Sequence, residues 1–391
     1  MRESQSSIQP FLRDRLTWLA YIMLAYIGFT QSMLGPLMPF LRSELGLNYT
    51  LGGFLPATLA IGLILSGLIG DRIAHRWSRG VVFWSGAVGL AISAALLGLS
   101  RDFELALVAV LGMGLGSSLT QVMIQALLVD QHGDHRAIAL TEANVAASFS
   151  ATLTPLVIGS LQNAGVSWRL VPVLVIFFLL LLATSFGHQL VPDSIAAQLD
   201  TIEGKGNLPL SFWLYWIVLF LIVAAEMSLA VWATDFLTNV AGLPRTKAAL
   251  AFGVFPAAML IGRFAGSRLA HRLSSLKLLI ASLWVTLLGF LIFWLTRVSA
   301  LNVLGLFIAG LGVANSYPLT LSIAVGLAAN QTNKASARVS LSVGTALLTA
   351  PLLMGWLADH LSLRYAYGIV IIFVIAAFAI IVNNRWPSES S

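Results

Sequence analysis

The sequence contains no cysteine and few charged residues. Without cysteine, the chain has no disulfide, no thiolate metal site and no cysteine nucleophile. Asp, Glu, Lys and Arg together make up only 10% of the 391 residues, whereas 58% are hydrophobic. That balance lies far from the composition of a soluble globular domain. The 22 Lys and Arg residues are scattered singly and form no basic face, so nucleic acid is not an expected partner. The scarcity of charge predicts a chain whose main solvent is the lipid bilayer.

Motifs for nucleotide and metal chemistry are missing as well. The chain has no Gly-Lys-Ser/Thr of a P-loop, so ATP is not expected as the direct energy source. Two histidines, His132 and His135, share a polar stretch with Asp130 and Asp134, which we interpret as an exposed loop. The Asp-rich or His-rich clusters of a membrane-bound enzyme are also missing. We therefore expect no metal, no cofactor and no enzymatic activity.

Long apolar runs recur from one end of the chain to the other. A helix needs about 20 apolar residues to cross the bilayer, and it satisfies its backbone hydrogen bonds internally. The sequence therefore predicts an all-α integral membrane protein with twelve transmembrane helices. The expected spans are residues 16–41, 51–70, 80–99, 104–129, 137–161, 168–190, 209–238, 247–270, 275–296, 299–327, 335–358 and 364–384. Lys and Arg are about twice as frequent in the loops on the side of the N-terminus, so both termini are expected to be cytoplasmic.

An internal repeat relates the two halves of the chain. GLIGDRIAHR at residues 67–76 aligns with RFAGSRLAHR at 263–272, and PLVIGSL from Pro155 aligns with PLLMGWL from Pro351. Both pairs share an offset of 196 residues, as the arithmetic 263 − 67 and 351 − 155 shows. The alternative is that Gly, Pro and basic loop residues recur by chance in any polytopic protein. The common offset favours duplication of a six-helix unit.

The repeat predicts two six-helix bundles related by pseudo-two-fold symmetry. We expect an N-terminal bundle at residues 1–190, a cytoplasmic linker at 191–208 and a C-terminal bundle at 209–391. Parallel repeats of this kind are typical of transporters whose pathway lies between the two halves.

At this point the chain resembles the major facilitator superfamily. The loop signature of that family after its second span, Gly-x-Leu-x-Asp-Arg-x-Gly-Arg-Arg, is matched by Gly67, Asp71, Arg72, His75 and Arg76. Span seven (AAEMSLAVWATDFL) and the Tyr-Pro pair of span ten are similar to fucose-permease-like members. The resemblance covers essentially the whole chain and implies transport by alternating access.

Some departures prevent the substrate from being copied from one subfamily. Sugar symporters that resemble fucose permease use carboxylates in spans one and four, where this chain has Thr30, Gln31, Gln121 and Gln125. Many drug antiporters carry an Arg in span four before a Gly-x-Gly, whereas the stretch VAVLGMGLG has none.

Glu226 is the most informative ionisable residue, because a charge inside a span calls for a role or a partner. The resemblance implies that spans one, four, seven and ten line the cavity. The expected cavity residues are Tyr26, Thr30, Gln31, Gln121, Gln125, Glu226, Trp232, Asn315 and Tyr317. We hypothesise that Glu226 couples proton movement to that of the substrate. The alternative is a Glu226 that is permanently hydrogen-bonded to Tyr or Gln across helices.

A second group of charged residues lies near the cytoplasmic ends of the spans. The resemblance places spans two and eleven, and spans five and eight, side by side. We predict two charge latches that hold the cytoplasmic gate shut in the outward-open state: Asp71 with Arg338, and Glu142 with Arg263 or Arg268. Arg72 and Arg76 belong to the same gating region. The alternative is that these charges only orient the loops.

These observations predict a monomeric secondary transporter in a bacterial cytoplasmic (inner) membrane, with the lipid bilayer as its surroundings. Its partners would be a small organic solute and a proton, and its favoured mode proton-coupled uptake of a polar solute. Proton-driven efflux of a drug or hydrophobic metabolite, and facilitation without ion coupling, stay open. A channel is disfavoured because a single chain supplies only half of the symmetry that a selectivity ring needs.

Overall fold

The computed structural model describes residues 11–189, 191–192, 207–328 and 331–384, without the side chains of 69–75 and 332–333. In this part of the chain the regular structure is entirely helical. Each of the twelve predicted apolar runs falls on one helix or on two helices joined end to end. Nine described segments have the length and composition of a membrane span, and three of them run through successive helices. The predicted all-α membrane fold is confirmed.

The described residues of the first half form seven α-helices and one short 3₁₀ helix. They are α1 (Arg15–Gln31), α2 (Leu34–Leu45), α3 (Tyr49–Arg76), α4 (Arg79–Leu99), α5 (Phe103–His132), η1 (Gly133–His135), α6 (Arg136–Asn163) and α7 (Leu170–Phe186). Predicted span one is thus broken into α1 and α2. At the break, the amide and the hydroxyl of Ser32 both donate to the carbonyl of Gly28, and the amide of Met33 turns to the carbonyl of Thr30 three residues earlier.

The second half contains the remaining eight helices. They are α8 (Leu210–Asn239), α9 (Arg245–Phe252), α10 (Val254–Leu269), α11 (Ser275–Leu295), α12 (Ser299–Gly326), α13 (Thr332–Leu361), α14 (Leu363–Ala366) and α15 (Gly368–Asn383). Spans eight and twelve are also each made of two helices. Most of the predicted linker, residues 193–206, lies outside the described residues, so the boundaries of the two bundles stay a prediction.

Polar side chains fix where several helices begin. Asp102 accepts a hydrogen bond from the amide of Leu105 at 2.8 Å and so caps α5. Asp14 caps α1 by accepting from the amide and the hydroxyl of Thr17, and it also accepts from Gln131. Partial burial raises the pKa of Asp14, but the hydrogen bonds from Thr17 and Gln131 lower it by more, so the pKa lies below its usual value. The carboxylate of Asp14 therefore stays ionised at neutral pH, where it satisfies the free amides at the start of α1.

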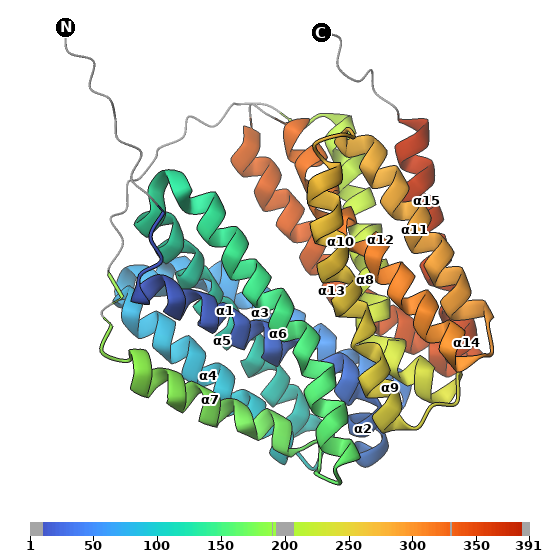
Figure 1. Cartoon of the computed structure of the whole chain (residues 1–391), viewed down its shortest axis with the longest axis horizontal. Helices are drawn as coiled ribbons and strands as arrows, with labels where there is room; N and C mark the ends of the chain where they lie inside the picture. Colours follow the sequence, from blue (N-terminus) through green and yellow to red (C-terminus); the bar gives the residue numbers. More distant parts are fainter. Residues whose placement is uncertain (1–10, 190, 193–206, 329–330, 385–391) are drawn as a thin grey trace, which may run out of the picture.

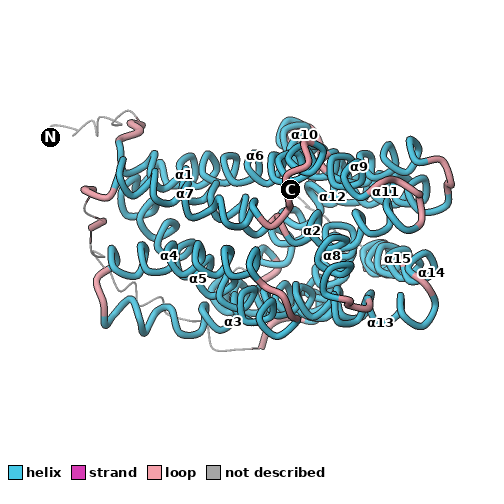
Figure 2. The backbone as a smooth tube through the Cα atoms, turned by 90° about the horizontal axis from the view of Figure 1, so that it is seen from below, coloured by secondary structure: helices cyan, strands magenta, loops and turns pink. Residues whose placement is uncertain are grey.

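The two halves lie side by side and meet mainly at one end. Figure 1 shows their ribbons converging at α2, α8 and α9 and spreading apart toward the start of α1 and the end of α15. We call the end at which the halves converge the outer end (residues 42–50, 235–245 and 355–363). The opposite end, where the halves spread apart, is the inner end. Between the halves, α3 packs against α13, and α6 packs against α9 and α10, which Figure 2 shows from below.

Glycines permit the closest helix contacts within each half. A Cβ atom on Gly114 of α5 would lie 2.3 Å from the carbonyl oxygen of Leu59 on α3. In the second half, a Cβ atom on Gly312 of α12 would lie 2.4 Å from the amide nitrogen of Thr286 on α11. Small residues are the usual means of close helix approach in membranes.

Candidate functional site

A cavity of about 310 Å³ lies between the two halves. Its walls come from α1, the α1–α2 break, α2, α3 and α6 on one side, and from α8, α9, α10 and α13 on the other. Most of the lining side chains are apolar, and Gln31, Ser32 and Glu226 are the polar ones. Two of the predicted cavity residues, Gln31 and Glu226, are therefore brought together across the interface between the halves.

Glu226 has no direct polar partner in the described part of the chain. Its side chain is half-buried in the middle of α8 and makes no hydrogen bond or ion pair with any described residue. The titratable side chains that interact with it electrostatically are Arg263 of α10 and Tyr317 of α12. A carboxyl group that faces an apolar cavity without a fixed partner is free to exchange a proton or contact a solute.

Several of the predicted cavity residues instead pack inside the first half. Thr30 is fully buried, and its hydroxyl donates to the carbonyl of Tyr26 one turn earlier. The hydroxyl of Tyr26 donates to the carbonyl of Ala87 on α4 at 3.3 Å. Gln121 is half-buried and Gln125 is exposed on α5, and neither lines this cavity.

The predicted residues of the second half are also spread out. Asn315 donates to the carbonyl of Gly262 at 2.7 Å and so joins α12 to α10 within one half. Tyr317 is half-buried on α12, within electrostatic range of Glu226. Trp232 is fully buried, and its indole N–H donates at 3.3 Å to the carbonyl of Pro351, a residue that lines the cavity. Trp232 thus lies beneath the cavity on the side of the outer end.

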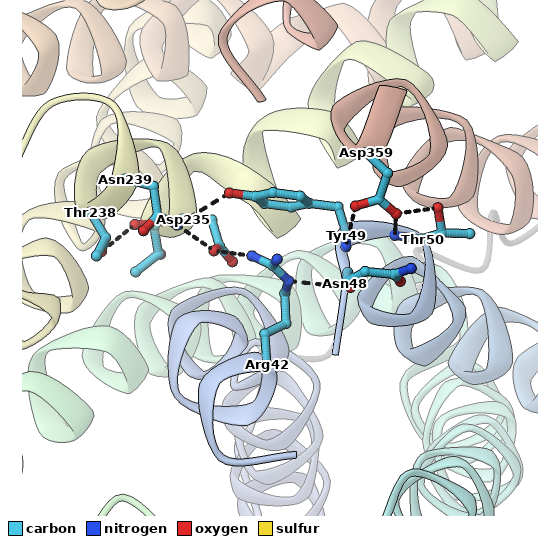
Figure 3. A network of polar contacts seen from close by, with 9 residues as sticks. Arg42, Asn48, Tyr49, Thr50, Asp235, Thr238, Asn239 and Asp359 are labelled. Carbon is cyan, nitrogen blue, oxygen red and sulfur yellow. Dashed lines mark hydrogen bonds and ion pairs between the residues drawn. The ribbon is translucent and has the colours of Figure 1, made fainter. Parts of the chain in front are cut away.

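A network of polar side chains joins the halves at the outer end (Figure 3). Arg42 of α2 forms an ion pair with Asp235 of α8 at 2.7 Å, and the two side chains are only 13% and 1% exposed. The guanidinium of Arg42 also lies 3.4 Å from the centre of the Tyr49 ring. Asn239 donates to Asp235 at 3.0 Å and to the hydroxyl of Tyr49 at 3.3 Å. A buried pair of this kind holds its partners firmly, because separating them leaves a charge without compensation.

Asp359, at the end of α13, caps a helix of the other half. Its carboxylate accepts hydrogen bonds from the amide of Tyr49 at 2.8 Å, and from the amide and hydroxyl of Thr50 at 2.7 and 2.6 Å. These amides begin α3 and have no partner within their own helix. A carboxylate is favoured there by hydrogen bonding and by the positive end of the helix dipole. The cap fastens α13 to α3.

Replacing Asp359 with alanine is expected to free the first turn of α3, at a cost of about 1 kcal/mol. Hydrogen exchange in nanodiscs should then speed up at the amides of Tyr49 and Thr50. Asp359→Asn, which keeps an acceptor, should retain most of the protection. As a matched control, Asp102→Ala removes the cap of α5 within a single half and should leave the first turn of α3 unchanged. Equal protection in Asp359→Ala and the unaltered protein would count against the cap.

The outer network is the part of the site that sequence reasoning missed. In the sequence, Arg42 is one of the loop charges that predict orientation, and no pattern assigns a role to Asp235 or Asp359. One signal was present: Asp235 is an ionisable residue within predicted span seven, nine positions after Glu226. The rule that drew attention to Glu226 applies equally to Asp235.

The predicted latch residues have other contacts in this conformation. Glu142 forms an ion pair with Arg13 at 2.5 Å and accepts from the hydroxyl of Tyr21 at 3.0 Å, all within the first half. Arg263 donates to the hydroxyl of Ser148 on α6 at 2.7 Å. Of the remaining members, Arg76, Arg268 and Arg338 are exposed, and the side chains of Asp71 and Arg72 lie outside the described residues. The two charge latches are expected in the outward-open state, in which the inner end is closed. They therefore stay a prediction.

No metal site is apparent in the described part of the chain. No group of three or more His, Asp and Glu residues there is placed to hold a metal ion.

Comparisons with known proteins match nearly the whole chain. A family model described as Major Facilitator Superfamily matches residues 20–299 and 215–390. An uncharacterized MFS-type transporter of Yersinia pestis is 25% identical over 392 residues, covering 96% of this chain and 97% of the relative.

Solved structures resemble the fold at low sequence identity. A bacterial homolog of the human lysosomal transporter Spinster, in an inward-facing and occupied conformation, superposes with a TM-score of 0.76 at 15% identity. It covers 97% of this chain and 100% of that structure. A variant of the nucleoside transporter NupG also gives a TM-score of 0.76, at 13% identity, covering 95% of this chain and 100% of that structure. At this identity the likeness concerns the fold alone.

Proposed function

The chain belongs to the major facilitator superfamily, and from that premise we propose that it is a secondary transporter that carries a small organic solute and couples it to a proton at Glu226. The solute would bind in the central cavity, and the two halves would rock about it so that the cavity opens to one face of the membrane at a time. Transport of this kind needs no cofactor, since an ion gradient supplies the energy.

One observation carries the proposal: Glu226 faces a mainly apolar cavity between the halves and has no hydrogen-bonding partner among the described residues. Ionisable side chains within a membrane are costly, and they mark ion pathways and proton relays. A carboxyl group at the interface of the halves is exposed alternately to the two aqueous phases, which is what a coupling residue requires.

The cavity lining favours a solute with a large apolar part and few polar groups. Met227, Phe252, Phe255 and Met259 contribute to the walls, and polar groups are few. Ligand sites of this kind bury apolar surface and orient the ligand through a small number of polar contacts. This supports a lipophilic solute, such as the drug or hydrophobic metabolite of the alternative, over the polar solute that the sequence favours.

Counterflow into proteoliposomes tests the proposal. The purified protein would be reconstituted with a pH-sensitive dye inside the vesicles and offered a panel of lipophilic and polar solutes. We expect a lipophilic solute to exchange across the membrane in counterflow, and we expect its net uptake into vesicles that contain no solute to move protons. Net uptake without any change of internal pH would contradict the coupling, and steady conduction without exchange would indicate a channel.

A further inference from the structure

A second and larger cavity, of about 870 Å³, lies on the outside of the first half. It is a groove between α1, α6 and α7, bordered on one side by Leu260 and Phe264 of α10. Its lining is almost wholly apolar, and wall residues such as Phe149, Phe178 and Phe264 are exposed on the surface of the protein. Because the surrounding solvent at this depth is hydrocarbon, the groove must be filled by an apolar chain and not by water.

The groove and the central cavity lie on opposite sides of the same two helices. On α6, Ser150 lines the groove, whereas its neighbour Ala151 lines the central cavity. On α10, Leu260 lines the groove, whereas Met259 lines the central cavity. The contact of α6 with α9 and α10, which we call the seam, is therefore the wall between bilayer and cavity.

The seam is closed tightly near the outer end. A Cβ atom on Gly159 of α6 would lie 2.4 Å from the side chain of Leu250 on α9, and a Cβ atom on Gly253 would lie 3.0 Å from Leu156. Farther toward the inner end, the hydrogen bond between Arg263 and the hydroxyl of Ser148 joins α10 to α6. Nearly two turns beyond Ser148, Glu142 lines the groove, where it pairs with Arg13 of the first half and not with a residue of α10. The seam is thus weaker toward the inner end.

Arg263 gives this weak part of the seam a positive charge. It lies between Leu260 and Phe264 on α10, is exposed, and makes a single hydrogen bond with the described residues, to the neutral hydroxyl of Ser148. A guanidinium carries five N–H donors, so most of its donors have no protein partner in the described part of the chain. Its electrostatic neighbour Glu226 lies on the cavity side. A cation beside an apolar groove is complementary to a molecule with an apolar chain and an anionic head.

We propose that the groove is a bilayer-facing access site for a single-chain amphiphilic anion, which places its chain between α1, α6 and α7 and its head group on Arg263. The seam would be its route from the membrane to the central cavity. The route rests on the proposed function, because it names the chemical class of the solute and the side from which the solute arrives. Binding in the groove does not depend on transport and can be measured separately.

Photolabelling in nanodiscs of neutral phosphatidylcholine tests the site. The probe is a long-chain fatty acid with a diazirine in the middle of its chain, and the matched probe is the corresponding long-chain alcohol. We expect the acid to label peptides of α1, α6 and α7 saturably, and to label them about tenfold more than the alcohol at equal concentration. Arg263→Gln should lower labelling by the acid to the level of the alcohol, whereas Arg272→Gln, an exposed arginine near the end of the same span, should not.

A second variant guards against misfolding of the first. Leu174→Trp adds bulk from the exposed wall of the groove and should abolish labelling while leaving Arg263 in place. Equal labelling by acid and alcohol, or full labelling in Arg263→Gln, would show that bilayer lipid fills the groove without selection and would overturn the proposal. Selective labelling without counterflow would refute the transport function and leave the site intact. Counterflow without labelling would refute the groove site and its access route, and would leave the transport function intact.

Discussion

Replacing Arg42 with alanine is expected to move the protein out of the conformation described here and toward one that is open at the outer end. The change leaves Asp235 buried without its cation, and breaking one partner of a buried pair costs about 3–5 kcal/mol. Opening the outer end restores water to the carboxylate, so the penalty falls on the closed state alone. A penalty of that size is enough to invert a two-state equilibrium that favours the closed outer end by a similar amount.

Spin-label distances measure this shift, because the chain has no native cysteine to interfere. Cysteines at Arg101 and Arg297, two exposed residues in loops of the two halves, report on the separation of the outer ends. We expect a longer distance in Arg42→Ala and in Asp235→Asn than in the parent. Arg169→Ala is a matched control, because it breaks an ion pair with Glu44 inside the first half. The same distance distribution in Arg42→Ala and the parent would contradict the role of the pair.

Replacing Glu226 with glutamine is expected to separate solute movement from proton movement. Glutamine keeps the size and hydrogen-bonding capacity of the side chain but cannot take up or release a proton. Counterflow of the solute should therefore persist, while accumulation driven by a proton gradient is lost and the pH dependence of transport becomes flat.

The pH series needs a control that changes charge without touching the cavity. Glu104→Gln alters an exposed glutamate in the first turn of α5 and should behave like the unaltered protein. If Glu226→Gln still accumulates solute against its gradient, the proton must be carried elsewhere. Asp235 would then be the next residue to test, because it is the other carboxylate on α8 and is fully buried.

Hydropathy predicts the helices of this chain well, because crossing the bilayer imposes a length and an apolar composition that few other structures need. The breaks within spans were not predicted. A hydropathy window averages over some twenty residues, so the turn at Ser32 between α1 and α2 leaves no trace in it. The turn at Gly253 between α9 and α10 escapes detection for the same reason.

The cavity was predicted less completely than the helices. Thr30 and Gln31 are neighbours in the sequence, yet Gln31 lines the cavity and Thr30 is buried against its own helix. Successive residues of an α-helix point about 100° apart, and the sequence does not give the rotation of each helix in the bundle. Knowing which spans line a cavity therefore limits the search to certain helices. It does not predict which side chains of those helices face the solute.

Contacts between the halves are the hardest to predict from one sequence. Arg42 and Asp235 are separated by 193 positions, and no local pattern links them. Sequence spacing predicts pairs one helical turn apart, because geometry within a helix is fixed. A pair that forms between two bundles depends on how the bundles dock.

The cap of α3 by Asp359 has a consequence for how the protein is made. Tyr49 and Thr50 precede Asp359 by 310 and 309 positions. Ribosomal synthesis runs from the N-terminus. Helix α3 is therefore delivered to the membrane long before the carboxylate that completes its first turn has been translated. Until α13 is synthesised, the amides of Tyr49 and Thr50 must donate to water. A chain truncated after its first bundle would therefore never form the hydrogen bonds that cap α3.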